Sequence, residues 1–279
     1  MVIILNKQII LEKQDLTYLN WAKIRNSSGT AGTFLKAYSE LGDKKTYYKL
    51  SDYDTVKGII GHESVNEIIV DRLLNLLEIE HLSYNLIYAD IILDGKICTA
   101  FVCASDDFKQ KGEDKTALDT YYELEHLDGE LPFDFCIRQG WEKQIYEMLV
   151  VDFLILNRDR HGANIEVLRN KKKKTIRLAP LFDHGLSLLF NVKDDFSQLD
   201  KIDVSEDKRV QCYVGSNSTL ENLNLIPKNK LPHFKIPEKE NFKKIFEDID
   251  VILPRELLDK ISEMIWRRLK YYEDFCNKK

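Results

Sequence analysis

An acid, an amide and a second acid follow a long apolar segment in the middle of this chain, and this pattern limits the folds that the sequence can adopt. The apolar run from Leu149 to Ile155 predicts a helix that is buried on most sides. The hexapeptide Asp159-Arg160-His161-Gly162-Ala163-Asn164 comes shortly after it, and Leu181-Phe182-Asp183-His184-Gly185 follows the next apolar strand. The sequence therefore predicts a loop of polar residues that is attached to a rigid, buried helix.

The spacing of these polar residues favours phosphoryl transfer. In a kinase catalytic loop an Asp orients the attacking hydroxyl, an Asn five positions later binds Mg²⁺, and a later Asp before Gly holds metal against the phosphates. Asp159, Asn164 and Asp183 fit these three places. A turn or capping aspartate explains Asp159 alone, but not the other two positions. We therefore expect Asp159 to be catalytic, Asn164 and Asp183 to bind Mg²⁺, and ATP to be the phosphoryl donor.

Two histidines stand beside these residues. His161 has no evident acid–base role, because a loose transition state requires little deprotonation of the acceptor hydroxyl. It is expected to brace the loop by hydrogen bonds. His184 is expected to be a packed, hydrogen-bonded histidine rather than a metal ligand.

The composition is that of a folded protein and disfavours several other classes. The chain has 279 residues, of which 44% are hydrophobic and 31% charged, with a net charge of −5. This acidic balance argues against direct binding of nucleic acid. Charged residues interrupt the apolar N-terminus, so neither a signal peptide nor a membrane span is expected. The five cysteines are scattered and never in C-x-x-C spacing, which indicates reduced thiols and a cytoplasmic location.

The first part of the chain, from about residue 20 to 105, carries strand signals around one helical segment. A small antiparallel sheet with one helix, over 63–77, is the simplest interpretation. From about residue 116 the pattern becomes helical, apart from a hairpin expected from 164–168 and 175–178. The expected strands of the first part are 34–38, 46–50, 86–93 and 97–102, the last two joined by a turn at Asp94-Gly95.

The first part also offers residues for the phosphates of ATP. The segment Ser27 to Thr33 is expected to cover the phosphates through backbone N–H groups, and its glycines permit close approach. Lys49 is expected to reach the phosphates from its strand, with Lys36 as the competing candidate. Glu67 or Glu63, one turn apart on the predicted helix, is expected to pair with the lysine, and Glu67 is favoured because it adjoins an apolar run. The residues expected to contact ATP are thus Lys49, Glu67, Ser28, Gly29, Thr30 and Gly32.

These motifs resemble those of a known family. Asp159-Arg160-His161-x-x-Asn164 is similar to the D-x-H-x-x-N loop of HipA-like serine/threonine kinases and to the D-R-H-x-x-N loop of phosphatidylinositol 3- and 4-kinases. The segment from Ser27 to Lys36 is similar to the phosphate loop of short HipA-like proteins, and Val65-Asn66-Glu67 to their N-E helix. The resemblance covers about residues 25 to 275.

The resemblance implies an α+β, bilobal protein-kinase-like fold of the phosphatidylinositol 3/4-kinase type. Residues 1–105 form the N-lobe, with an antiparallel sheet and one helix, and residues 106–279 form a mainly helical C-lobe. It also implies transfer of the γ-phosphoryl group of ATP to Ser or Thr of a protein, with Mg²⁺. Members also phosphorylate themselves, which makes Ser27, Ser28 and Thr30 candidate sites. A phosphate there places roughly two negative charges where ATP phosphates lie, so self-inhibition is expected.

The chain also departs from the family pattern. HipA toxins carry an extra N-terminal subdomain that meets an antitoxin, whereas about 25 residues precede the glycine-rich segment here, so no dedicated antitoxin partner is expected. Two alternatives remain: a lipid kinase, from the same loop motif, and a catalytically weak interaction module with a kinase fold.

Overall fold

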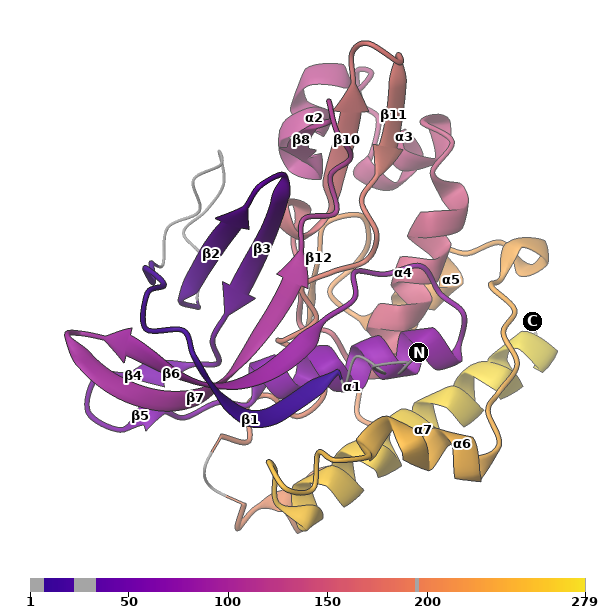
Figure 1. Cartoon of the computed structure of the whole chain (residues 1–279). Coiled ribbons are helices and arrows are strands. Elements are labelled where there is room, and N and C mark those ends of the chain that lie inside the picture. Colours follow the sequence, from indigo (N-terminus) through magenta and orange to yellow (C-terminus); the bar gives the residue numbers. More distant parts are fainter. Residues whose placement is uncertain (1–7, 23–33, 194–195, 279) are drawn as a thin grey trace, which may run out of the picture.

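The computed structural model describes residues 8–22, 34–193 and 196–278, which form a mixed α/β structure (Figure 1). The strands are β1 (Ile9–Asp15), β2 (Lys36–Leu41), β3 (Lys44–Lys49), β4 (Tyr53–Asp54), β5 (Gly58–Ile59), β6 (Asn85–Leu93), β7 (Lys96–Asp106), β8 (Asp114–Ala117), β9 (Asp159–Arg160), β10 (Glu166–Asn170), β11 (Thr175–Leu178) and β12 (Gln211–Cys212). The α-helices are α1 (Glu63–Leu76), α2 (Leu118–Glu125), α3 (Pro132–Arg138), α4 (Glu142–Ile155), α5 (Thr219–Asn224), α6 (Lys239–Lys243) and α7 (Arg255–Lys278). Short 3₁₀ helices are η1 (Gly162–Asn164), η2 (Leu199–Lys201), η3 (Lys228–Lys230) and η4 (Lys244–Phe246).

The largest sheet has the strand order β1-β6-β7-β3-β2. The predicted turn at Asp94-Gly95 joins β6 to β7, and both residues have positive φ, of 50° and 75°, as a tight hairpin turn requires. The prediction of an antiparallel sheet is wrong at one edge, because β1 pairs with β6 in parallel. Charged residues interrupt the apolar pattern of β1, and a parallel partner lies far away in sequence, so neither the strand nor its direction was apparent.

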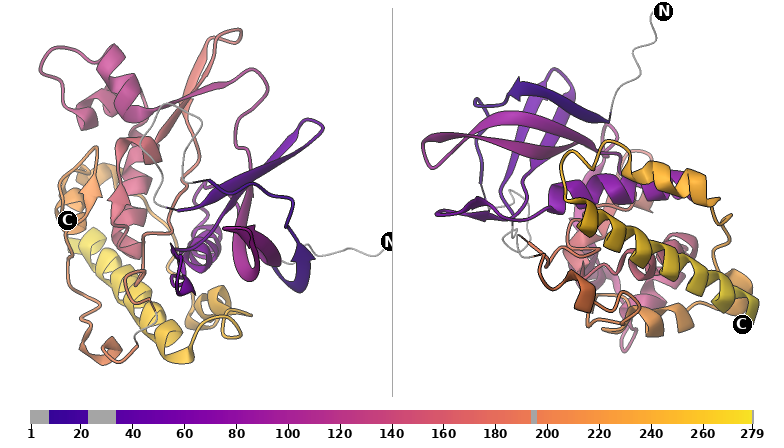
Figure 2. Two further views of the ribbon diagram at one scale, coloured as in Figure 1. Left: turned by 90° about the vertical axis from the view of Figure 1, so that its left-hand side faces the viewer. Right: turned by 90° about the horizontal axis from the view of Figure 1, so that it is seen from below.

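Helix α1 packs against β6 and β7 on one side and contacts η4 on another. Figure 2 shows it between the sheet and the layer that contains α6 and α7. Ile68, Ile69 and Leu73 have no exposed surface, because the apolar side chains of this helix point toward neighbours around most of its circumference. The helix was predicted over 63–77 and agrees with the structure to within one residue.

Helix α4 is the buried helix that the apolar run predicted, and it packs against α5 and α7. A separate short helix precedes it, since α3 ends at Arg138 and α4 begins at Glu142. Gly140 lies between them with φ of 79°, a left-handed conformation that ends helices. The C-terminal end of α4 leads directly into residues 157–164, so the loop is attached to the centre of the core.

Two smaller sheets surround this loop. The predicted hairpin is present as β10 and β11, which pair antiparallel, and β8 adds a third strand beside β10 that the sequence did not indicate. The two residues of β9 pair in parallel with β12. Within the described ranges, no helix combines the length and the apolar character that crossing a membrane requires.

His62, just before α1, makes the stability of the fold sensitive to acid. Its side chain is 3% exposed, and burial lowers its pKa from 6.5 to about 4. Because the folded pKa lies below the unfolded one, the stabilisation is complete above about pH 6.5 and is lost as the pH falls toward 4. We expect this residue alone to account for a loss of about 2 kcal/mol in unfolding free energy between pH 7 and pH 5. Urea titrations of the wild type and His62→Leu at both pH values test this: equal losses in the two proteins contradict it.

Candidate functional site

A buried ion pair joins the sheet to α1. Lys49 ends β3, and its Nζ lies 3.0 Å from Oε1 of Glu67 and also contacts the Asp183 carboxylate. Burial opposes protonation of Lys49, but the charges of Asp183 and Glu67 outweigh it and raise the pKa of the lysine. Glu63 has a different partner, since its Oε2 accepts the backbone N–H of Asp52 at 3.0 Å. The structure therefore pairs Lys49 with Glu67 rather than with Glu63.

The Glu67 carboxylate also holds the segment that follows Asp183. It accepts the backbone N–H of His184 at 2.9 Å and that of Gly185 at 3.1 Å. Burial raises the pKa of Glu67, while the Lys49 ammonium opposes this rise. Asn66 supports the same segment, because its Nδ2 donates to the carbonyl oxygens of Gly185 and Ser187. Helix α1 thus sets the position of the Asp-His-Gly segment through side chains that have no exposed surface.

Asp183 lies where several charged groups meet. Its backbone has a left-handed φ of 59°, which aspartate tolerates better than most residues, and its N–H donates to the Tyr84 hydroxyl at 3.2 Å. Lys36 Nζ lies 3.7 Å from its Oδ2. Lys49 and Lys36 are directly opposite each other on β3 and β2. Both lysines that the sequence left as candidates therefore converge on this carboxylate.

His184 is packed in the interior, as expected, but it is not fully hydrogen-bonded. It is 1% exposed, and its Nε2 lacks a hydrogen-bond partner among the described residues. Burial, together with the positive charge of Arg160, holds its pKa well below the usual range. The ring is therefore neutral at physiological pH.

Arg160 connects the loop to α4 and to the residue before Asp183. Its guanidinium donates to both carboxylate oxygens of Asp152, at 2.9 and 2.8 Å. The same group donates to the carbonyl oxygens of Asn164, at 3.1 Å, and Phe182, at 3.0 Å. Arg160 is 1% exposed, so one buried side chain fixes the distance between the loop and the Asp183 segment.

Asp159 and Asn164 are held at the two ends of that loop. The amide Nδ2 of Asn164 donates to the backbone oxygen of Asp159 at 2.7 Å. His161 Nδ1 accepts the N–H of Ala163 at 3.1 Å, which caps η1, and its Nε2 lies 3.7 Å from Asp159 Oδ2. His161 therefore braces the loop, as predicted. The Asp159 side chain remains 26% exposed, so an acceptor can approach it.

The donor set suits a magnesium ion that nucleotide phosphates help to bind. Asn164 and Asp183 offer an amide oxygen and a carboxylate, and Mg²⁺ prefers such oxygen donors, one or two from protein and the rest from phosphates and water. In the described part of the chain, no group of three or more His, Cys, Asp or Glu residues is placed to hold a metal by itself. The predicted phosphate-contacting residues Ser28, Gly29, Thr30 and Gly32 lie outside the described residues.

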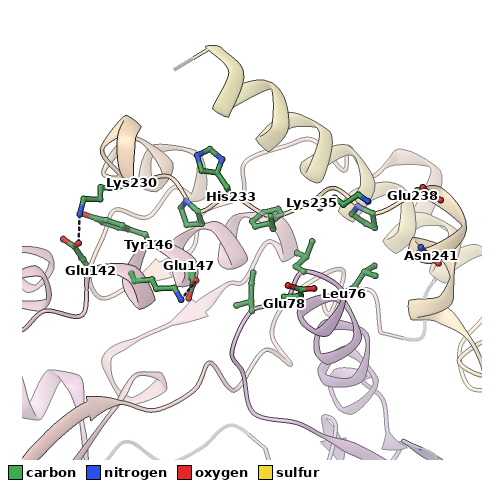
Figure 3. Close-up of a pocket in the computed structure, with 16 residues that line it drawn as sticks. Leu76, Glu78, Glu142, Tyr146, Glu147, Lys230, His233, Lys235, Glu238 and Asn241 are labelled. Carbon is green, nitrogen blue, oxygen red and sulfur yellow. Dashed lines mark hydrogen bonds and ion pairs between the residues drawn. The ribbon is translucent and has the colours of Figure 1, made fainter.

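A cavity of about 630 Å³ lies elsewhere, between the C-terminal end of α1, the first turns of α4 and the segment 230–241 (Figure 3). Glu78, Tyr146 and His233 are among its lining residues, and Lys230 bonds Glu142 at 2.7 Å at one end. None of the predicted site residues lines it. The cavity is therefore separate from the cluster of Lys49, Glu67 and Asp183.

Four residues of the site were given no role from sequence. Arg160 and Asn66 were recognised only as parts of motifs, and Asp152 and Tyr84 were not singled out. Asp152 and Asn66 did carry a signal, because each is a polar residue within an apolar helical run and a buried polar group needs a partner. Tyr84 carried none, since its contact with Asp183 joins distant segments.

No family model and no curated protein sequence matches this chain. Solved structures with a similar fold include the proinflammatory kinase CtkA of Helicobacter pylori, with a TM-score of 0.60 and 16% sequence identity over 92% of this chain and 93% of that one. HipA, in the toxin–antitoxin complex of Shewanella oneidensis MR-1 with HipB and operator DNA, has a TM-score of 0.50 and 13% identity over 92% of this chain and 67% of that one. The predicted HipA-like kinase fold, resembling that of CtkA, is confirmed.

Proposed function

We propose that this protein is a bilobal kinase, with residues 1–105 as N-lobe and 106–279 as C-lobe. It uses ATP and Mg²⁺ to phosphorylate Ser or Thr of a protein acceptor. The observation that carries the proposal is a single connected cluster. Lys49, Glu67 and Asp183 meet in one cluster. Arg160 joins the segment that carries Asp183 to the loop that bears Asp159 and Asn164. The likeness in fold to CtkA, a kinase, supports it.

Each residue has a role that follows from its chemistry. Lys49, kept protonated by its two acidic neighbours, binds ATP phosphates when nucleotide competes for it. Asn164 and Asp183 hold Mg²⁺, which neutralises charge on the phosphates. Asp159, whose side chain is 26% exposed, orients the acceptor hydroxyl and accepts its proton. The proposed partner is a protein acceptor, and the mechanism needs neither an antitoxin nor DNA.

We further propose autophosphorylation of Ser27, Ser28 or Thr30 in the segment expected to cover the phosphates. The backbone N–H groups of Ser28, Gly29, Thr30 and Gly32 serve the ATP phosphates in this scheme. A phosphoryl group on this segment carries roughly two negative charges and competes with ATP for the same N–H groups and for Lys49. Autophosphorylation would then inhibit the enzyme.

Mass spectrometry of the pure protein after incubation with ATP and Mg²⁺ tests the proposal. Phosphoserine or phosphothreonine is expected, and EDTA should prevent its formation. A phosphoinositide and a mixture of protein acceptors are offered in parallel. Transfer to the lipid alone favours the lipid-kinase alternative, and no transfer to any acceptor favours the interaction module. Phosphate confined to the C-lobe contradicts the inhibitory site.

Lys49 and Lys36 are expected to differ in their effect on ATP use. Lys49→Met removes the cation that Glu67 and Asp183 hold in the interior, and kcat/KM for ATP should fall about 100-fold. The Lys36 side chain is 28% exposed, and its Nζ lies 3.7 Å from Asp183 Oδ2. Lys36→Met should therefore lower kcat/KM for ATP by less than about 10-fold. Initial rates against ATP concentration measure both. Equal losses in the two variants would mean that both lysines serve the phosphates.

A further inference from the structure

An apolar surface is exposed where α2 leads into α3. Leu124, Leu127 and Leu131 are 74, 58 and 65% exposed. A tight turn shapes this surface, because the Glu130 N–H donates to Leu127 O at 3.0 Å and the Glu130 carboxylate accepts the Leu127 N–H at 3.0 Å. We call these three leucines, together with the acidic residues Glu123, Glu125, Asp128, Glu130 and Asp134, the α2–α3 face. In Figure 1 it lies at the top of the molecule, away from α6 and α7.

The same face carries an excess of negative charge. No lysine or arginine occurs between Leu118 and Ile137. Arg138 neutralises Glu130, with Nε 2.6 Å from Oε1. Four further carboxylates on the segment are exposed and, among the described residues, none is paired with a cation: these are Glu123, Glu125, Asp128 and Asp134. Exposed leucines among unpaired acids match a ligand that is both apolar and basic.

The α2–α3 face adjoins the loop that bears Asp159. Helix α2 touches η1 so closely that a Cβ on Gly162 would lie 2.5 Å from Asp119 Cβ. The Tyr122 ring packs edge-on against Tyr213, with centroids 6.2 Å apart. The backbone N–H of Tyr213 in turn donates to Arg160 O at 2.9 Å. The carboxylates of α2 act on Tyr213: burial, together with the charges of Asp119 and Glu123, raises its pKa to about 12.

We propose that the α2–α3 face binds a basic segment of the protein acceptor that also carries large apolar residues, and so places a nearby hydroxyl at Asp159. This inference rests on the proposed kinase function for its catalytic consequence. The binding itself does not depend on that function. The leucines supply apolar contact, and the unpaired carboxylates select Lys- and Arg-rich acceptors over acidic ones.

Binding is tested without nucleotide, by fluorescence anisotropy with two short peptides around one serine. One alternates lysine with leucine, and the other has glutamate in place of lysine. The full chain should bind the basic peptide at least about 10-fold more tightly, and the difference should shrink in 0.5 M salt, where charges are screened within a few ångströms. Equal binding of the two peptides overturns the proposal.

Two matched charge variants locate the binding surface. Glu123→Gln/Glu125→Gln/Asp128→Asn removes three charges from the α2–α3 face. Glu238→Gln/Glu240→Gln/Asp250→Asn removes three exposed carboxylates in and near α6. The first variant should raise Kd for the basic peptide about 10-fold, and the second should leave it unchanged. A third variant, Leu127→Ser, should weaken binding at both salt concentrations. Equal effects of the two charge variants would mean that net charge alone attracts the peptide, and would refute the α2–α3 face as the binding surface.

Turnover separates this proposal from the proposed function. With ATP and Mg²⁺, the first variant should raise KM for the basic peptide about 10-fold and leave kcat and autophosphorylation unchanged. Unchanged KM with intact autophosphorylation refutes acceptor binding at the α2–α3 face but does not contradict the kinase function. No phosphoryl transfer by the wild type refutes the kinase function, and the anisotropy result still decides the peptide-binding surface.

Discussion

Asp183→Asn is expected to lower the rate of phosphoryl transfer by about 10³-fold while the protein remains folded. Asparagine has nearly the same shape as aspartate and also tolerates the left-handed φ of 59° found at this position. The substitution therefore removes the charge and little else. Without it, one proposed Mg²⁺ ligand becomes neutral, and Lys49 loses one of its two acidic partners. Single-turnover measurement of phosphate transfer, with a thermal unfolding curve of each protein, gives the result.

Two controls separate charge from position at Asp183. Tyr84→Phe keeps the carboxylate and removes the hydroxyl that accepts the Asp183 N–H at 3.2 Å, so a loss of less than about 10-fold is expected. Asp159→Asn should match Asp183→Asn in lost rate but leave the dependence on Mg²⁺ concentration unchanged. Transfer by Asp183→Asn at the wild-type rate would refute the metal-binding assignment. A loss in Tyr84→Phe as large as that in Asp183→Asn would show that backbone position is the dominant effect.

Sequence predicted best those features that local pattern determines. Apolar spacing placed α1 within one residue, and the Asp94-Gly95 turn followed from the backbone that tight hairpins require. Spacing singled out Asp159, Asn164 and Asp183 as candidates, and in the structure Arg160 bonds both the loop of the first two and the residue before Asp183. Their roles remain predictions that the experiments above address.

Features that depend on distant segments were beyond such reasoning. Glu63 and Glu67 share one face of α1, and spacing alone cannot tell which reaches Lys49. In the structure Glu63 instead accepts a backbone N–H from Asp52. The parallel edge strand β1 and the two-residue strand β12 lack any periodicity that distinguishes them from loops. Arg160 contacts α4, its own loop and Phe182 at once, and only the assembled fold brings these together.

The geometry suggests a division of labour between rigid support and exposed chemistry. Glu67, Asn66 and Arg160 have at most 1% exposed surface, and each bonds backbone groups of the segments that carry the proposed site. Asp159 by contrast has a partly exposed side chain, and its Oδ2 lies 3.7 Å from His161 Nε2. Substitution of the supports should therefore affect stability and activity together, whereas substitution of Asp159 should affect activity alone.

Arg160→Met is expected to cause the largest loss of stability among the variants considered. Among the described residues, it leaves the buried Asp152 carboxylate with Asn157 Nδ2 as its one side-chain donor, at 2.8 Å. It also removes the donor to the carbonyl oxygens of Asn164 and Phe182. Breaking a buried ion pair by removing one partner costs about 3–5 kcal/mol. For a chain of this size that corresponds to a fall in Tm of about 10 °C. Thermal and urea unfolding measure it.

Matched variants decide whether the buried pair is responsible. Lys230→Met breaks an ion pair of similar length, 2.7 Å from Glu142, but the two side chains are 49 and 39% exposed, so the cost should stay below about 1 kcal/mol. Asp152→Leu/Arg160→Met removes both buried charges, and it should be less destabilised than the two single variants combined, because no charge is left alone in the core. Activity should not return in the double variant, since Asn164 and Phe182 still lack their shared donor. An active, fully stable Arg160→Met protein would show that α4 and β12 hold the loop without the guanidinium.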